Sequence, residues 1–296
     1  MRLVIVGADG IIGRILVSIA TVRFKVLALD IKFEDPEAAL WENCEIGHLD
    51  ITKYSDIEDI LMPDDVVVNL AAESRITNCN NDVIGSLEVN VLGSVNVMEA
   101  CLKVGVLHLI QASSLYAKGS FGGFYSASKR ALECYAQTYS ICTSLNLSII
   151  RLGSIFGNVD DKNSLPTKLL RRVAGLDQEN LSANSRIIRD YLPASSVCDA
   201  ILALIDNPIY FGCEIEFLTG DKISLDVLLT EIESATGKDP RPYVEIHNEE
   251  ASPKGQYLES PEIKKMLHKV TIDVSDDSRD LESFFKEIYM DCVGAT

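Results

Sequence analysis

The first 150 or so residues of the chain alternate short apolar runs with longer stretches of mixed apolar and polar residues. Short apolar runs bounded by polar turns are typical of strands buried on both faces, and the stretches between them have the period of amphipathic helices. The predicted strands are residues 2–6, 25–30, 44–48, 66–70, 107–112 and 147–152, and the predicted helices are residues 11–22, 83–104 and 124–145. This order predicts an α/β fold with a doubly wound parallel sheet.

The pattern loosens after Arg151, where residues 157–185 are polar and interrupted. Further along, helices are expected at residues 195–205, 224–236 and 280–289, and strands at 214–219 and 243–246. We therefore expect a main domain over residues 1–157 and a smaller C-terminal lobe over residues 158–296. Segments around residues 186–220 are expected to return to the main domain.

Composition and charge limit the kinds of partner. The chain has 296 residues, 47% of them apolar, and a formal net charge of −17. Such an acidic protein is poorly suited to nucleic acid or to an anionic membrane, although local arginines and helix N-termini still allow an anionic small substrate. No apolar stretch approaches the ~20 residues that span a bilayer, and the first residues lack the pattern of a leader peptide, so we expect a cytosolic protein.

Cysteine and histidine usage argues against disulfides and metal sites. The eight cysteines are scattered without a C-x-x-C pair, mostly in apolar or helical surroundings, which favours buried free thiols. The four histidines are not clustered, so no metal site is expected.

A glycine-rich turn follows the first predicted strand. Gly7, Gly10 and Gly13 would allow a tight turn, close approach of a pyrophosphate to the backbone, and close packing of the next helix. Asp30 ends the second strand, seventeen residues after Gly13, where a carboxylate accepts the ribose hydroxyls of NAD and repels the extra phosphate of NADP. An ordinary strand–turn–helix with a capping aspartate is the alternative, and Lys32 could assist a 2′-phosphate. The pair favours NAD.

Tyr125 and Lys129 lie four residues apart on one face of a predicted helix. The lysine would lower the pKa of the phenol and reach the nicotinamide ribose, while the tyrosine exchanges a proton with the substrate. An ordinary amphipathic helix also carries such pairs. Ser114 follows the fifth strand, at the sheet edge where open α/β sheets bind ligands, and would orient the reacting hydroxyl, with Ser113 as the second choice. A serine that merely terminates the strand is the alternative.

These motifs and several further segments follow one another along the chain in a characteristic order. They are the glycine turn at 7–13, Asp30, His48-Leu49-Asp50-Ile51, Asn69-Leu70-Ala71-Ala72-Glu73-Ser74, Asn90 within residues 88–94, Tyr125-x-x-x-Lys129, residues 151–157 and Arg189-Asp190-Tyr191. Over nearly its whole length the chain resembles the extended short-chain dehydrogenase/reductase family, in particular its NAD-dependent epimerase/dehydratase group, which acts on nucleotide sugars.

The resemblance implies a Rossmann sheet that binds NAD in residues 1–157 and a substrate-binding lobe in residues 158–296. It implies catalytic roles for Ser114, Tyr125 and Lys129, with Asn90 supporting a proton relay. The implied cofactor contacts are Gly7, Gly10, Ile11, Ile12, Gly13, Asp30, Asp50 (near the adenine), Ile51, Ala71, Ala72, Asn90, Tyr125 and Lys129. The implied substrate contacts are Glu73, Ser113, Ser114, Ser154 and Arg189.

In such relatives the arginine at Arg189 meets the diphosphate of a nucleotide-diphosphate sugar. The family also implies a homodimer built from helices at about 86–104 and 124–145. Surface polysaccharide or deoxysugar synthesis is the pathway that it suggests.

Departures from the family pattern narrow the reaction. Family dehydratases have an acid pair after the catalytic threonine, whereas Leu115 and Tyr116 follow Ser114 here, so dehydration is not expected. Only ten residues separate Ser114 from Tyr125, as in some family 4-ketoreductases. Ser154 stands where many members have asparagine, and residues 193–197 lack a common acidic pair. An unusual sugar pocket is expected.

The sequence therefore predicts an NAD-dependent nucleotide-sugar epimerase that acts at a sugar carbon, C4 by preference. The first alternative is an NAD(P)H-dependent reductase of nucleotide-4-keto sugars. An enzyme for a substrate without a nucleotide is a further possibility, against which Arg189 weighs. A non-catalytic NAD-sensing protein is the third, against which the retained Tyr125 and Lys129 weigh.

Overall fold

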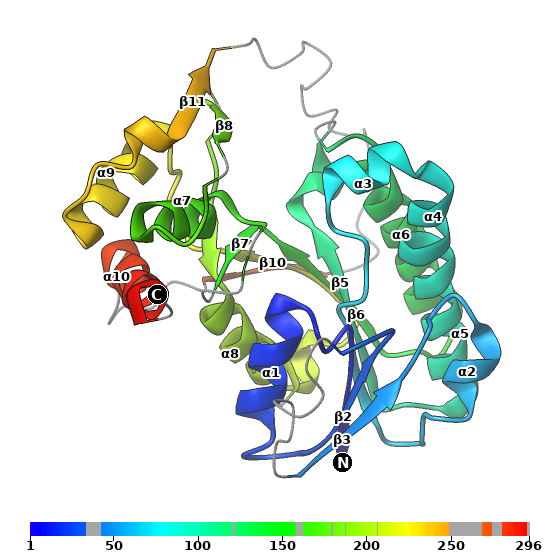
Figure 1. The fold of residues 1–296 in the computed structure, drawn as a ribbon. Coiled ribbons are helices and arrows are strands. Elements are labelled where there is room, and N and C mark those ends of the chain that lie inside the picture. Colours follow the sequence, from blue (N-terminus) through cyan, green and yellow to red (C-terminus); the bar gives the residue numbers. More distant parts are fainter. Residues whose placement is uncertain are drawn as a thin grey trace. The chain divides into compact units, whose positions relative to one another are not determined.

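The computed structural model describes residues 1–33, 43–119, 122–157, 161, 163–178, 180–186, 188–205, 207–248, 268–273 and 280–294. The chain divides into two compact units, which contain the elements drawn in Figure 1. Unit 1 comprises Met1–Leu152, Cys198–Glu216 and Gln256–Ile272, and unit 2 comprises Gly153–Val197, Phe217–Gly255 and Asp273–Thr296. The main unit is therefore discontinuous in sequence.

Unit 1 is built on a sheet with the strand order β12-β10-β6-β5-β4-β1-β2-β3. Its strands are β1 (Arg2–Val6), β2 (Lys25–Asp30), β3 (Cys44–His48), β4 (Val66–Asn69), β5 (His108–Ser114), β6 (Leu147–Leu152), β10 (Cys213–Leu218) and β12 (His268–Asp273). Every pairing from β10 across to β3 is parallel. The predicted doubly wound Rossmann sheet is confirmed, and its strand order reverses beside β1, where such sheets bind ligands at the carboxyl ends.

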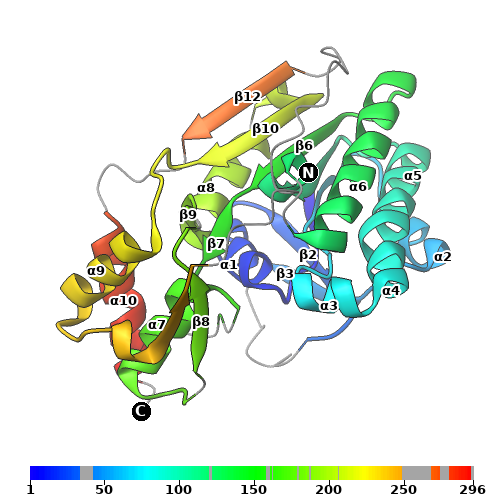
Figure 2. The ribbon, with the colours of Figure 1, turned by 90° about the horizontal axis from the view of Figure 1, so that it is seen from above.

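Helices cover both faces of this sheet. They are α1 (Ile11–Ala20), α2 (Tyr54–Glu58), α3 (Ile76–Asn81), α4 (Val83–Leu87), α5 (Ser94–Val104), α6 (Gly123–Cys142) and the greater part of α8 (Ala194–Ile205). Figures 1 and 2 show α4, α5 and α6 together on one side and α1 on the other. Cys198 of α8 donates its thiol hydrogen to the Ile12 carbonyl of α1 at 3.4 Å, which ties these two helices together.

The core between the sheet and α5 and α6 follows from the alternation of side chains along each strand. Every second residue of β1, such as Val4, contributes to one buried cluster, which also contains Val97 and Met98 of α5 and Leu132 of α6. The intervening residues of the strands are also buried, because the second face is covered too. This explains why the strands read as continuous apolar runs.

Unit 2 has its own core. Its elements are β7 (Ser154–Phe156), α7 (Leu165–Ala174), β8 (Leu181–Asn184), β9 (Tyr191–Pro193), α9 (Leu225–Thr236), β11 (Val244–His247) and α10 (Leu281–Gly294). Two short parallel ladders form, β7 with β9 and β8 with β11. The ring of Phe156 packs against Phe284 and Phe285 of α10, with centroids 6.2 and 5.3 Å away.

Some sequence predictions differ from the structure. Residues 157–185, predicted as an interrupted segment, contain α7 and β8, and the strands β9 and β12 were not predicted. The helix α7 begins after Ser164, whose hydroxyl accepts from the Thr167 amide, and it buries Leu169, Leu170 and Val173. Helical spacing of these apolar residues was present, but the polar residues on either side concealed it.

The predicted single helix over residues 83–104 is continuous but not uniform. It is α-helical in α4 and α5, and between them lies a π-helical segment, η1 (Glu88–Gly93). Such widened turns occur often at functional sites. None of the helices in the described part of the chain is both long enough and apolar enough to cross a membrane. All eight cysteines are free, as predicted, although Cys134 and Cys142 are exposed rather than buried.

Candidate active site

The glycine turn connects β1 to α1 and lies close to the backbone of the segment that follows β4. Gly7 has φ +83°, and a Cβ on it would lie 2.7 Å from the Ala71 nitrogen. A Cβ on Gly13 would lie 2.3 Å from the Gly7 oxygen. Side chains are therefore excluded from this cradle, and Gly10 opens α1 without a side-chain cap, leaving helix N-terminal amides for an anion. These features fit a dinucleotide pyrophosphate, beside Ile11, Ile12 and Ala71.

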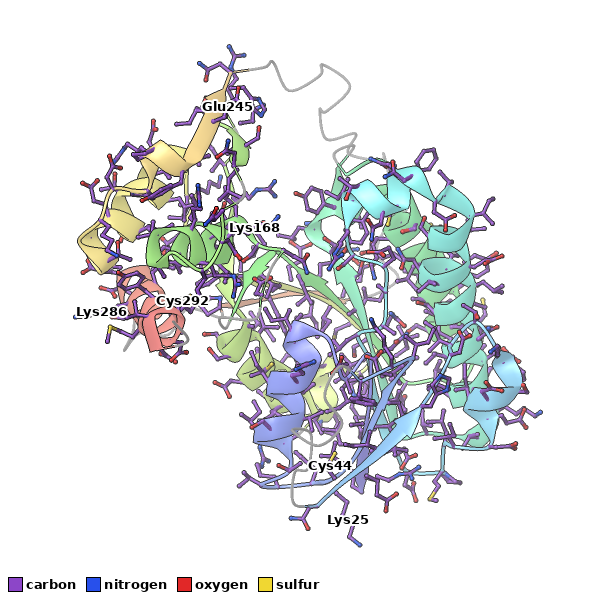
Figure 3. All side chains as sticks on the ribbon, viewed as in Figure 1. Lys25, Cys44, Lys168, Glu245, Lys286 and Cys292 are labelled. Atoms are coloured by element: carbon purple, nitrogen blue, oxygen red, sulfur yellow. The ribbon has the colours of Figure 1, made fainter. Side chains whose placement is uncertain are left out.

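Asp30 lies beside this turn, as its position at the end of β2 predicts. Its Oδ2 accepts a hydrogen bond from the Asp9 amide at 2.9 Å, which fixes the carboxylate next to the glycines. Lys25 and Cys44, at the amino ends of β2 and β3, lie at the bottom of Figure 3. Asp30 belongs to the opposite, carboxyl edge of the sheet.

The second carboxylate assigned to NAD, Asp50, is engaged in local structure. Its Oδ1 accepts from the Thr52 hydroxyl at 2.7 Å and from the Thr52 amide at 3.1 Å, and Lys53 lies 3.3 Å from Oδ2. The Thr52 hydroxyl, together with Lys53, lowers the pKa of this carboxyl. Its neighbour Ile51 is buried, and a Cβ on Gly93 would lie 2.7 Å from Ile51 Cδ1.

Tyr125, Lys129 and Ser114 come together in unit 1. Tyr125 and Lys129 lie in the first two turns of α6, both buried, with Lys129 Nζ 5.9 Å from the centre of the tyrosine ring. Lys129 Nζ also donates to the Ala112 carbonyl of β5 at 3.3 Å. Ser114 ends β5, and its hydroxyl accepts from the Tyr116 amide at 3.2 Å. The ring of Tyr116 stands edge-on to that of Tyr125, with centroids 6.2 Å apart.

Burial dominates the protonation of this pair. It raises the pKa of Tyr125 to about 12, although the Ser114 hydroxyl acts to lower it. Burial also lowers the pKa of Lys129 to about 8, against the attraction of Glu133. The lysine is therefore a cation at neutral pH that releases its proton readily. The pKa of the phenol is therefore raised overall, and the lowering expected from the sequence is wrong for the chain by itself.

The side chain of Asn90 is fully engaged with its neighbours. Its Oδ1 accepts from the Glu73 amide at 2.8 Å, and its Nδ2 donates to the Glu73 carbonyl and to Ser128 Oγ, each at 3.0 Å. Ser128 in turn donates to the Tyr125 carbonyl at 2.8 Å. Asn90, at the centre of the π-helical segment, thus links the β4–α3 connection to the backbone of the helix that carries Tyr125.

Ser113, the second choice among the two serines, faces a buried charge cluster that the sequence did not suggest. Its hydroxyl donates to Glu133 at 2.6 Å, and Glu133 holds Arg151 through two hydrogen bonds of 2.8 and 2.7 Å. Glu214 and Glu216 of β10 also contact Arg151, at 2.8 and 3.2 Å. One signal in the sequence could have revealed this cluster, because Arg151 interrupts the apolar strand β6 and Glu133 lies on the buried face of α6.

The predicted substrate contacts fall in both units. In unit 2, Arg189 Nη1 donates to Ser154 Oγ at 3.3 Å, so these two residues are brought together. In unit 1, the Glu73 carboxylate accepts from the Arg75 amide at 2.8 Å and from Asn78 Nδ2 at 2.9 Å, which fixes the start of α3. Ala72 lies next to it and is half-buried. Among the described residues no group of acidic, histidine or cysteine side chains is arranged to hold a metal ion.

Comparisons with known proteins identify the family of this chain and its fold. Protein CapI of Staphylococcus aureus is 22% identical over 183 residues, which cover 56% of this chain and 55% of CapI. The chain therefore spans about half the length of that relative. A UDP-glucuronate 4-epimerase of Thermodesulfobacterium geofontis is 23% identical over 246 residues, 77% of this chain and 74% of the relative.

A solved structure with the same fold is the UDP-glucose 4-epimerase of Thermus thermophilus in complex with NAD. It has a TM-score of 0.79 and 21% identity, and all of both chains is covered. Residues 3–211 match the NAD dependent epimerase/dehydratase family, which confirms the resemblance inferred from the motifs and NAD as the cofactor. The chain belongs to the NAD dependent epimerase/dehydratase family of enzymes.

Proposed function

We propose that this enzyme is an NAD-dependent nucleotide-sugar epimerase that inverts a sugar carbon, C4 by preference. The observation that carries the proposal is the grouping of Ser114, Tyr125 and Lys129 in the unit that also holds the glycine turn and Asp30. No carboxylate follows Ser114, since Leu115 and Tyr116 occupy the next positions, and this disfavours elimination of water.

Bound NAD supplies the acceptor, and later the donor, of a hydride. Tyr125 as phenolate would take the proton of the sugar hydroxyl during oxidation of that carbon and would return it during the later reduction from the opposite face. Ser114 donates to the reacting oxygen. Because burial is the largest of the effects that raise the pKa of Tyr125, a nearby positive charge is needed to favour the phenolate, and the Lys129 cation would supply it.

The nucleotide-diphosphate part of the substrate is assigned to Arg189 and Ser154 of unit 2. A guanidinium is suited to a diphosphate because it offers several donors in one plane. Ser154 Oγ already accepts from Arg189, so the two side chains would act on one group. Arg189→Ala should strongly weaken the binding of a nucleotide sugar, but it should leave the binding of a substrate without a diphosphate unchanged.

A homodimer is part of the proposal. The outer surfaces of α4, η1 and α6 expose large apolar side chains, and α4, α5 and α6 lie side by side (Figure 1). These residues are Ile84, Leu87, Leu92, Tyr135 and Ile141, which are 64, 51, 49, 51 and 39% exposed. An apolar surface formed by two long helical segments suits a second copy of the same chain, because both copies then bury equivalent patches.

The test is to denature freshly purified protein and to quantify the released nucleotide by chromatography. Near-stoichiometric NAD(H) supports the epimerase, because the cofactor is then recycled within each turnover. Protein without nucleotide would favour the alternative, an NAD(P)H-dependent reductase of nucleotide-4-keto sugars, which must exchange its cofactor. The observation in favour of the reductase is the short connection of ten residues between Ser114 and Tyr125, which resembles that of some 4-ketoreductases of the family.

Turnover is then followed with UDP-glucose, UDP-N-acetylglucosamine and UDP-glucuronate, by NMR detection of inversion at C4. Tyr125→Phe should abolish it. A Tyr125→Phe protein with unchanged biological activity would instead support an NAD-sensing protein. The setting suggested by the family, synthesis of a surface polysaccharide or a deoxysugar, is tested by the cell-surface glycans of a strain that carries Tyr125→Phe.

A further inference from the structure

The first turn of α6 carries Tyr125 but has no cap of its own. Its N-cap is Gly122, which has no side chain to accept from the free amides of the first turn. The amide of Phe124 instead donates to Asn80 Oδ1 at 3.1 Å. Asn80 belongs to α3 and precedes Phe124 by 44 residues, so the cap is supplied by a different helix.

Gly123 makes this approach possible. A Cβ on Gly123 would lie 2.4 Å from Asn80 Oδ1 and would displace the Asn80 side-chain amide, and Gly123 has φ +56°. Asn80 therefore occupies the space that a side chain at the first helical position would fill. The contact depends on this particular pair of residues.

A second contact holds the same turn from another direction. The hydroxyl of Ser126 lies 2.7 Å from the Tyr116 carbonyl and 2.9 Å from the Gly119 carbonyl, and donates to them. These carbonyls belong to the segment that follows Ser114. Tyr125 thus lies between two anchored residues, Phe124 and Ser126.

The helix that supplies the cap is itself fixed. The Glu73 carboxylate accepts from the Arg75 amide and from Asn78 Nδ2, and the Glu73 backbone is held by Asn90. Asn80 therefore reaches α6 from a helix with a defined position. The same Asn90 reaches Tyr125 through Ser128, so α3 and the π-helical segment support the tyrosine at both of its flanks.

We propose that Asn80 is a positioning residue for the reaction, which sets the phenol of Tyr125 against Ser114 and Lys129 by capping α6 from outside. The inference rests on the proposed catalytic role of Tyr125. It assigns a function to a residue that need not touch substrate or cofactor. Small displacements of a reacting group lower rates steeply, so the loss of this cap should act on the chemical step.

The test compares Asn80→Ala, Asn80→Asp and the control Asn81→Ala, which removes an exposed amide from the neighbouring position of α3. Asn80→Ala should lower kcat by roughly tenfold or more, with KM and NAD affinity near those of the parent protein. Asn80→Asp should restore most of kcat, because a carboxylate accepts the same hydrogen bond and suits a helix N-terminus. Asn81→Ala should leave kcat unchanged.

The proposal is overturned if Asn80→Ala keeps the parent kcat, or if Asn80→Asp fails to restore it. If Asn80→Ala does not fold, Gly123→Ala places a methyl against the Asn80 oxygen and should lower kcat in the same way. Failure of the proposed catalytic role of Tyr125 looks different, because Tyr125→Phe would then retain turnover. An inactive Tyr125→Phe with a fully active Asn80→Ala rejects the positioning role alone.

Discussion

Ser113 donates its hydroxyl hydrogen to Glu133 at 2.6 Å, inside the unit that carries Tyr125 and Lys129. The hydroxyl of the next residue, Ser114, donates instead to the Leu152 carbonyl at 3.5 Å and lowers the pKa of Tyr125. We therefore expect the two adjacent serines to differ. Ser114→Ala should lower kcat by about a hundredfold while leaving the protein folded. Ser113→Ala should keep most of kcat but should lower the free energy of unfolding by about 1–3 kcal/mol, because a buried carboxylate oxygen loses a donor. Steady-state kinetics and urea denaturation separate these outcomes, and equal losses of kcat would contradict the assignment.

Asp30 should determine the choice between NAD and NADP. Asp30→Ala removes the carboxylate that is held by the Asp9 amide, and should lower the affinity for NAD by about tenfold or more. The affinity for NADP should rise relative to that for NAD, because the carboxylate no longer repels the 2′-phosphate. Isothermal titration with both nucleotides measures this change. Asp59→Ala, at an exposed position after α2, is the control and should bind like the parent protein. An unchanged ratio of the two affinities in Asp30→Ala would show that Asp30 does not contact the ribose.

Lys129 should reduce the stability of the protein near neutral pH. Its pKa is about 8 in the folded protein, below the ordinary value of 10.5, because burial disfavours the cation. Below pH 8 the folded state therefore carries an unfavourable buried charge, and stability rises between pH 8 and 10.5 as the folded protein releases this proton first. Lys129→Met should increase the free energy of unfolding at pH 7 by up to about 3 kcal/mol while abolishing turnover.

The stability gain from Lys129→Met should shrink as the pH is raised from 8 towards 10.5. Urea denaturation at several pH values measures it, with the exposed Lys286→Met as control (Figure 3). A gain that does not depend on pH, or a loss of stability at pH 7, would contradict the assigned cost of the buried cation.

The Arg151 cluster should be sensitive to removal of its cation. Burial opposes the charge of Arg151, but the hydrogen bonds and charge of Glu133, with Glu214, raise its pKa above the ordinary value. Arg151→Met would leave these buried carboxylates facing one another, and should cost about 3–5 kcal/mol of unfolding free energy. Arg241→Met removes an exposed arginine paired with Glu233 and should barely change the melting temperature. Similar losses in the two variants would argue against a special role for burial.

The proposed dimer should depend on the exposed apolar residues of the long helices. Substituting both Leu87 and Leu92 by glutamate should convert a dimer into a monomer, because charges would then be buried at the interface. Sedimentation velocity measures the change. Val22→Glu, at a residue that is 84% exposed beyond α1, should remain dimeric. A parent protein that sediments as a monomer would refute the proposed dimer.

The sheet and the grouping of Tyr125 with Ser114 followed from local sequence signals. Parallel strands buried on both faces must be continuously apolar, and an i,i+4 pair on a helix faces one way whatever surrounds it. The position of Ser114 was predictable because a parallel sheet gathers its carboxyl ends at one edge.

What the sequence did not disclose depends on residues distant in the chain. That Ser113 binds Glu133 and that Asn80 caps α6 follow from tertiary contacts, and neither leaves a periodic pattern. The high pKa of Tyr125 likewise reflects its burial. The nearby Lys129 had suggested that this pKa would be lowered. The π-helical turn at Asn90 has no distinct spacing of apolar residues either.

The discontinuity of unit 1 has a consequence for synthesis on the ribosome. Strand β6 is complete when Leu152 emerges, but β10, its neighbour, follows roughly sixty residues later. At about 5–20 residues per second, the edge of β6 stays open for about 3–12 s. During that interval Arg151 lacks Glu214 and Glu216, and an unpaired strand edge is available to other chains. The nascent protein is therefore exposed to aggregation after its glycine turn and the helix that carries Tyr125 have been made, while the sheet still lacks its later strand.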